Sequence, residues 1–292
     1  MRSLETSSFR LSLQTLLRNK SAFVGTIIVI LYFVDALVME VYPKLFGITQ
    51  PNSLVENFSS PLPLPPSFSH PLGTTAYGID LLTSILKAIK FDLAYSLAVV
   101  LSGAALGVII GVISGYVGGA LDEFLMRITD IVFSIPYLVL ALAVGFVIGR
   151  TYTSMVLALA IVWWPLYARY GRALTLSIKT LPYVDSARLY GMNGFKILLK
   201  HVIPNVLPPV FVQISLDLGT IMPTFSTLSF IGFIPNANLP ELGFLTTLGL
   251  NYIQTAPWTV IFPGLAITVF SLAANLMGEG LRDVFDPRRR SE

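Results

Sequence analysis

Cysteine is absent from all 292 residues, and charged residues make up only 12% of the chain. The lack of cysteine excludes disulfide bonds and thiolate metal sites. The shortage of charge is more informative, because about a quarter of the residues in a soluble domain are charged. With 54% hydrophobic residues and a mean hydropathy of +0.74, the chain is expected to lie largely in lipid.

Several catalytic patterns are missing as well. The sequence contains no Gly-x4-Gly-Lys-Ser/Thr loop to cradle nucleotide phosphates, so ATP hydrolysis has no site here. It contains no His-Glu-x-x-His pattern, and its two histidines, His70 and His201, are expected on opposite sides of a membrane. We therefore expect no enzyme activity, no metal and no cofactor in this chain.

Six apolar stretches are long enough to cross a bilayer. A hydrocarbon core of about 30 Å needs about 20 residues of helix, because backbone amides must be satisfied within the segment. The stretches are 21–39, 93–117, 131–149, 151–168, 203–231 and 258–278. Four prolines, Pro204, Pro208, Pro209 and Pro223, interrupt the fifth, where we expect kinks or a broken start. The expected fold class is an all-α integral membrane protein of about six transmembrane helices.

Lysine and arginine gather on one side of these stretches. They precede the first, lie between the second and third, crowd the loop after the fourth and follow the sixth, whereas 232–257 has none. The positive-inside rule therefore predicts that both termini lie in the cytoplasm. The net charge of +3 then reflects topology rather than nucleic-acid binding. The basic start could also belong to a secretory signal, but its apolar run is nearly twice as long as a signal core.

The predicted order of segments follows from this topology. It is a cytoplasmic segment 1–20, a first helix 21–41, an external loop 42–92, a five-helix core 93–281 with a cytoplasmic loop 169–204, and a tail 282–292. The external loop contains a proline-rich run at 61–66, which favours an extended conformation. Residues 79–90 predict a short interfacial helix with Lys87 and Lys90 toward water. Asn57-Phe58-Ser59 in the same loop is a glycosylation sequon.

The loop 169–204 alternates helix signals with breakers. Pro182 is placed to start a helix, Asp185 lies in its first turn, and Gly191 supplies a left-handed stop. Asn193 can cap a second helix whose apolar positions recur at helical spacing: Phe195, Leu198, Leu199 and Val202. The same residues also serve simply as caps and stops. A short exposed helix held between turns nevertheless suits docking into a socket on a cytoplasmic partner.

These residues carry a resemblance to a known family. The run Tyr183, Val184, Asp185, Ser186, Ala187, Arg188 and Gly191, followed by Ile203 and Pro204, resembles the EAA signature of ATP-binding-cassette (ABC) importer permeases. Asp185 stands where glutamate is usual, and Ser186 where alanine is usual. From His70 onward, motifs such as Phe133-Ser134-Ile135-Pro136 are similar to the second permease of the oligopeptide and dipeptide class.

The resemblance implies a type I ABC-importer permease fold, with an extra N-terminal helix outside a five-helix core. It also implies that the signature residues couple the chain to an ATPase. The implied partners in the cytoplasmic membrane are a homologous second permease, two ABC ATPase subunits that bind ATP and Mg²⁺, and an extracellular substrate-binding protein. No nucleic acid is implied.

The implied substrates are di- and oligopeptides, but departures from the family pattern leave an alternative open. Phe225 stands where the family often has glutamate, and the loss of charge leaves room for neutral oligosaccharides. Asp217 is an unusual acid in the fifth stretch, where an ionisable group usually faces the bundle interior or a cavity. Asp217 and Phe225 are therefore candidate pathway residues, unless Asp217 merely bonds to Ser215 or Thr220. An ion-coupled secondary transporter is the alternative from another class, although neither an internal repeat nor a series of buried ionisable residues is clear.

Overall fold

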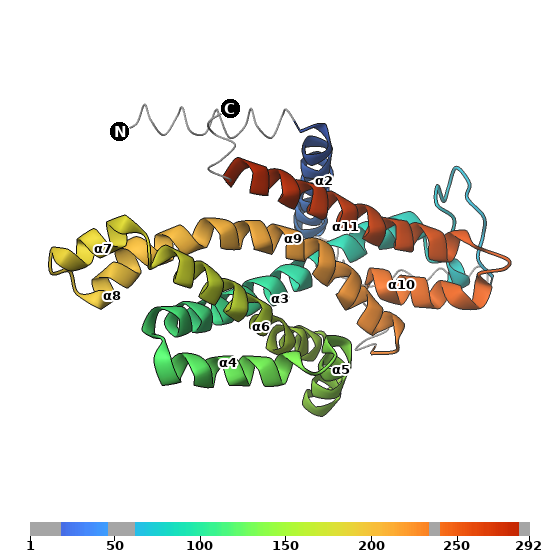
Figure 1. Cartoon of the computed structure of the whole chain (residues 1–292). Helices are drawn as coiled ribbons and strands as arrows, with labels where there is room; N and C mark the ends of the chain where they lie inside the picture. The colour runs from blue at the N-terminus through green and yellow to red at the C-terminus, as the bar shows by residue number, and fades with distance from the viewer. Residues whose placement is uncertain (1–18, 46–61, 234–239, 286–292) are drawn as a thin grey trace.

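The structure is a computed structural model that describes residues 19–45, 62–233 and 240–285. Within these residues all regular secondary structure is helical apart from one isolated bridge between Thr74 and Asp80, so the predicted all-α class is confirmed. Five long helices pack against one another (Figure 1): α2 (Lys20–Leu45), α3 (Leu81–Val117), α6 (Tyr152–Ile178), α9 (Ile203–Phe230) and α11 (Trp258–Phe285). The sequon at Asn57 lies outside the described residues.

The number of candidate membrane spans among the described residues follows from the length and composition of the helices. Four segments are long and apolar enough to cross a membrane: Lys20–Val41, Leu81–Val117, Gly194–Phe230 and Trp258–Val284. A bent pair, α4 and α5, makes a fifth if it is counted as one span. The remaining stretch of the six corresponds to α6, which is 27 residues long but carries Trp163, Trp164 and Pro165 at its centre. These residues make it less apolar than the other spans.

The second span begins earlier than the sequence indicated. The interfacial helix expected over 79–90 is instead the first part of α3, which runs without interruption for 37 residues. Asp80 caps its start, because its Oδ1 accepts a hydrogen bond from the Thr83 amide at 2.8 Å. Lys90, expected to face water, forms an ion pair with Glu40 of α2 at 2.9 Å. No breaker separates Lys90 from the apolar run, so helix propagation continues through the expected boundary.

The third expected span, 131–149, is not one straight helix. The chain forms α4 (Gly119–Phe133) and α5 (Tyr137–Ile148), which are bent by 88° at the break between them. Pro136 has no amide hydrogen to donate, and it disfavours the helical conformation at Ile135. The four prolines expected to interrupt the fifth span do not break it, because α9 runs from Ile203 to Phe230 with Pro208, Pro209 and Pro223 inside it. The irregular part is a π-helical turn, Leu198–Val202, directly before α9.

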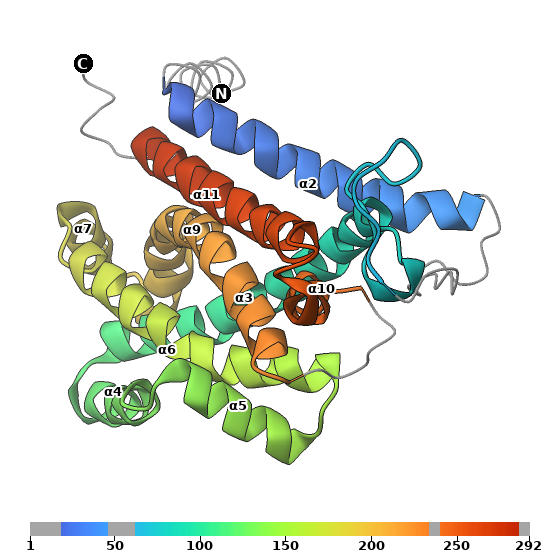
Figure 2. The same cartoon turned by 90° about the vertical axis from the view of Figure 1, so that its right-hand side faces the viewer.

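Glycines let α3 and α6 approach closely. A Cβ atom on Gly107 would lie 2.2 Å from the carbonyl oxygen of Trp164, and one on Gly111 would lie 2.2 Å from that of Ala168. Backbone therefore touches backbone along this contact, as small residues permit in membrane helices. On the other side of the bundle α2 lies along α11 (Figure 2), where the Tyr32 hydroxyl donates to the Ala266 carbonyl at 2.7 Å.

The end of the molecule assigned to the outside carries a short buried helix, α10 (Leu242–Gly249). Two carboxylates satisfy its first amides: Glu241 accepts from Gly243 and Phe244 at 2.9 and 2.7 Å, and Asp92 of α3 accepts from Leu242 at 3.1 Å. Both acids are fully buried. Burial raises the pKa of Glu241 to about 7.

The loop before α3 is also held by a carboxylate. Asp80 pairs with His70 at 2.9 Å in addition to capping α3. Partial burial by itself would raise the pKa of Asp80, but the hydrogen bonds from Thr83 and His70 outweigh it and lower that pKa. Trp258, at the start of α11, donates to the Thr74 carbonyl at 3.3 Å and connects this loop to α11.

Candidate partner-docking site

The helix expected within the loop 169–204 is present as α7 (Pro182–Leu189). It is followed by α8 (Gly194–Ile197), and both lie at the opposite end of the molecule from α10 (Figure 1). Pro182 occupies the first turn, where a missing amide hydrogen costs nothing, and Asp185 lies in the same turn. The boundaries of α7 therefore follow from the residues that predicted it.

One face of α7 anchors it to the protein. Val184 is fully buried and Ala187 is 8% exposed, and they join a cluster with Ile197 and Val202. The ring of Tyr183 lies 6.1 Å from that of His201. These contacts join α7 to the residues that lead into α9, while the chain itself joins α7 to α6. The helix is therefore anchored on both sides of its loop.

The opposite face of α7 is open. Asp185 and Arg188 form an exposed ion pair at 2.9 Å, and the Ser186 hydroxyl donates to the Pro182 carbonyl at 3.0 Å. An exposed pair of this kind contributes little to folding, so its charges remain available to a partner. Leu189 and Tyr190 are 89% and 90% exposed, which is unusual for large apolar side chains.

The sequence places Leu189 and Tyr190 inside the run that resembles the signature, but it assigns neither residue a role of its own. Their signal was present in the spacing, because Val184 and Ala187 lie three residues apart on the anchored face. On a helix with 3.6 residues per turn, the positions five and six residues after Val184, which are Leu189 and Tyr190, fall on the side away from the core.

The turn after α7 has the predicted left-handed glycine. Gly191 has φ +73°, and no atom lies within 4 Å of the position that a Cβ would take. Its conformation alone therefore favours glycine. The Met192 amide donates to the Ala187 carbonyl at 3.1 Å, and Asn193 caps α8 by accepting from Phe195 at 2.9 Å.

The apolar face expected beyond Asn193 is only partly correct. Val202 is fully buried, but Phe195 and Leu199 are 67% and 49% exposed. The π-helical turn adds a residue to the helix repeat, so positions that would share a face in an α-helix are rotated apart. Ile203 and Pro204 begin α9, where Pro204 again falls in a first turn.

The segment around α7 is bonded to the junction of α3 and α4. The Lys179 ammonium donates to the Gly115 carbonyl at 2.7 Å, and the Tyr116 hydroxyl donates to the Gly194 carbonyl at 2.8 Å. Arg172 binds both oxygens of Asp122, at 2.6 and 2.7 Å. A force applied to α7 therefore reaches α3, α4 and α6 through short polar contacts as well as through the chain.

The two candidate pathway residues lie elsewhere, on α9. Asp217 is 5% exposed and accepts hydrogen bonds from Trp163 at 3.2 Å and Gln213 at 2.9 Å, rather than from Ser215 or Thr220. Phe225 is fully buried and stacks on Tyr95 with ring centroids 5.4 Å apart. Within the described residues, no group of three or more His, Asp or Glu side chains could hold a metal ion.

Residues 107–291 match the family of binding-protein-dependent transport system inner membrane components. The chain belongs to this family. It is therefore a multi-pass protein of the cytoplasmic membrane, a permease component of an ABC importer that works with a binding protein and an ATPase. The resemblance derived from the signature residues is confirmed, and the family supplies a transport component rather than a catalytic one.

Several relatives match over most of their length. The dipeptide transport system permease protein DppC of Alkalihalophilus pseudofirmus is 32% identical over 98% of this chain and 91% of its own. DppC of Escherichia coli is 37% identical over 93% and 90%, respectively. The glutathione transport system permease protein GsiD of Pectobacterium atrosepticum is 37% identical over 77% and 75%.

A solved structure shares the fold. A chain of the MetNI methionine ABC transporter, in an inward-facing conformation, matches with a TM-score of 0.55 and 18% identity. The match covers 70% of this chain and 97% of that one. It supports the expected type I importer fold for the helical core.

Proposed function

We propose that this permease carries di- and oligopeptides into the cell and that α7 is the element that receives the ATPase. The observation that carries the coupling role is the two-sided burial of α7: Val184 and Ala187 are packed inward, while Leu189 and Tyr190 are almost fully exposed. The peptide substrate is supported by the relatives named for dipeptides and glutathione. Those names give no support to the oligosaccharide alternative.

The complete assembly that we propose contains a homologous second permease, two ATPase subunits and an external binding protein in a lipid bilayer. A single chain offers four or five candidate spans among its described residues. These are too few helices to enclose a solute as large as a peptide. In this assembly ATP and Mg²⁺ belong to the ATPase subunits, and the signature residues from Tyr183 to Pro204 form the coupling loop.

Helix α3 is suited to carry movement across the membrane. Its 37 residues span about 55 Å at 1.5 Å per residue. Near its end, Gly115 accepts a hydrogen bond from Lys179 and Tyr116 donates one to Gly194, while Asp92, well inside the first half of the helix, caps α10. Closure of the ATPases would draw α7 along with α6 and α3, and would thereby move α10 at the outer side.

Reconstitution of the native complex in vesicles tests this function. We expect uptake of a labelled dipeptide that requires both the binding protein and ATP, and no comparable uptake of a labelled malto-oligosaccharide. Transport by this chain alone, driven by an ion gradient, would instead establish a secondary carrier. ATP-dependent uptake of the oligosaccharide but not of the dipeptide would refute the proposed peptide substrate and leave the proposed coupling role of α7 intact.

A further inference from the structure

The break between α4 and α5 lies inside the membrane. Helix α5 ends next to Arg150, which donates to the carbonyl of Gly232 at the outer end of α9. Its 12 residues span about 18 Å, so Ser134, Ile135 and Pro136 lie no more than about 18 Å below that level. The hydrocarbon core is about 30 Å thick. Non-helical backbone at such a depth must be covered by protein or must line a water-filled space.

The charges of α4 favour the water-filled space. Because α4 leaves the break at 88° to α5, it cannot continue straight through the bilayer. Glu123 and Arg127 on α4 are 72% and 74% exposed, and Asp130 is half exposed and paired with Arg169 at 2.6 Å. Charged side chains of this kind do not face lipid, because their desolvation is costly. The face of α4 that carries these charges is therefore in water, whereas Phe124 and Ile131 on the same helix, 61% and 64% exposed, suit an apolar neighbour.

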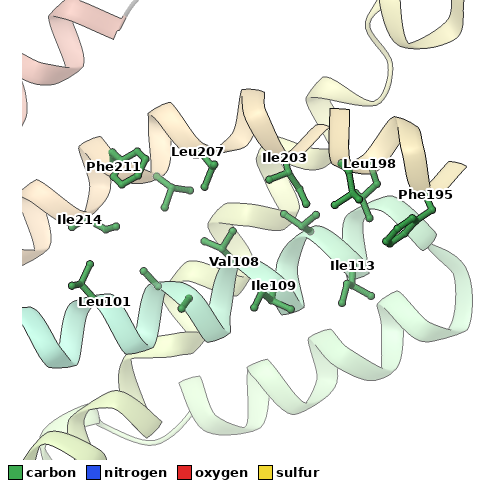
Figure 3. Close-up of a pocket in the computed structure, with 15 residues that line it drawn as sticks. Leu101, Val108, Ile109, Ile113, Phe195, Leu198, Ile203, Leu207, Phe211 and Ile214 are labelled. Atoms are coloured by element: carbon green, nitrogen blue, oxygen red, sulfur yellow. The ribbon is translucent and has the colours of Figure 1, made fainter. Parts of the chain in front are cut away.

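A pocket of about 480 Å³ opens at the break itself. Its walls are the backbone and side chains of residues 132–137 and one face of α6, including Trp163. A volume of this size lies within the range of small-molecule sites. The contrast with a second cavity is instructive: a groove of about 500 Å³ between α3 and α9 is lined by aliphatic and aromatic side chains such as Val108, Ile109 and Phe211 (Figure 3).

Trp163 is held rigidly in the pocket at the break. Its indole nitrogen donates to Asp217, which Gln213 holds from α9, and its ring meets Tyr137 edge to face at 5.8 Å. The polar edge of the indole is thus already bonded, and the ring lines the pocket. A fixed aromatic surface beside non-helical backbone suits a ligand that has both amide groups and apolar side chains.

We propose that the pocket at the α4–α5 break contacts the transported peptide within the membrane, with Trp163 as a specificity-determining residue. The peptide class rests on the proposed function. Asp217 acts through Trp163 as a positioning residue. Phe225, the other candidate pathway residue, is not among the residues that line this pocket.

The absence of cysteine provides a direct test of accessibility. Ser134→Cys places a thiol of nearly the same size in the pocket, and Ala105→Cys places a matched thiol in the apolar groove. Each variant is incorporated into the complete complex, which is reconstituted so that reagent reaches both of its sides. The complex is treated with a charged, membrane-impermeant methanethiosulfonate, and the labelling of this chain is followed by mass spectrometry. We expect Ser134→Cys to react at least tenfold faster than Ala105→Cys. Saturating dipeptide, binding protein and ATP should change that rate at least threefold.

A specificity assay provides the second test. We expect Trp163→Ala to change the ratio of phenylalanine-containing to alanine-containing dipeptide uptake at least fivefold, and Trp163→Phe to change it less. Asp217→Asn retains an acceptor for the indole and should resemble Trp163→Phe. The binding protein is the same in every sample, so a changed ratio arises in the membrane.

The outcomes separate this proposal from the proposed function. If the unmodified complex carries dipeptides but Ser134→Cys reacts no faster than Ala105→Cys, the pocket is covered by lipid or by the second permease and the proposal is overturned. An unchanged uptake ratio in Trp163→Ala also overturns it. If the unmodified complex carries no peptide, the proposed substrate fails, whatever the labelling shows.

Discussion

Removal of the exposed apolar pair on α7 should uncouple the ATPase without unfolding the permease. Leu189 and Tyr190 are 89% and 90% exposed, so truncation to alanine costs little folding free energy, within about 0.5 kcal/mol. If both side chains are buried against the ATPase, each truncation forfeits about 1.5–3 kcal/mol of binding free energy. Non-additivity reduces the sum, and a combined loss of about 2–4 kcal/mol corresponds to roughly 30- to 1,000-fold in affinity.

The assay compares the unmodified chain with Leu189→Ala/Tyr190→Ala in the same lipid. ATPase binding is measured by titration, and binding-protein-stimulated ATP hydrolysis and uptake are measured in the reconstituted complex. Phe124→Ala on α4 and Leu157→Ala on α6 are matched controls, because both side chains are also exposed but lie outside the coupling loop. If the affinity of the double variant for the ATPase is within threefold of that of the unmodified chain, α7 does not dock on the ATPase through these exposed side chains.

Three further predictions concern backbone and charge. Gly191→Ala should lower the free energy of unfolding by about 1–2 kcal/mol, because φ at this position is +73°. Gly191→Val should lower it more and reduce ATP-driven uptake further, whereas Gly191→Asn should be tolerated. Gly111→Ala should lower the thermal midpoint, because the added Cβ would lie 2.2 Å from the Ala168 carbonyl oxygen and would reduce the free energy of unfolding by about 1–3 kcal/mol. Gly264→Ala should leave the midpoint unchanged, because no atom lies within 4 Å of the added Cβ. Burial raises the folded-state pKa of Glu241 from 4.5 to about 7, so its contribution to stability is fully present below pH 4.5 and is lost as the pH rises to about 7. Corrected amide exchange in α10 should accordingly be slower at pH 5 than at pH 7.5, and Glu241→Gln should reduce this difference.

The sequence was most informative where structure is local. Pro182 begins α7 and Gly191 lies two residues after its last residue, because both act through their own backbone conformation. Asn193 likewise forms the cap that its position predicted. The register after Asn193 was wrong, because the π-helical turn arises from the joint demands of α8 and α9 rather than from a local signal.

Long-range pairings were beyond the sequence. Asp92 caps α10 across 150 positions, and Trp163 reaches Asp217 across 54, so neither partner could be named from spacing. Ser215 and Thr220, the partners expected for Asp217, lie nearby on the same helix, whereas Trp163 comes from α6. Helix α10 was hidden for a related reason: its two capping carboxylates come from different segments, and its eight residues are too few to stand out within 232–257.

The contact between α3 and α6 determines how a movement of α7 can travel. Gly107 and Gly111 bring the two backbones so close that a Cβ on either would clash with a carbonyl oxygen of α6, so we expect α3 and α6 to move together. Both α6 and α9 are continuous with the coupling loop, whereas α3 reaches from its contact with Lys179 to Asp92 beneath α10. The glycines thus join α6, which is continuous with the loop, to α3, which is not. By contrast, the break at Ser134–Pro136 interrupts the neighbouring path through α4 and α5, which leaves α5 free to respond differently from α3 to the same displacement.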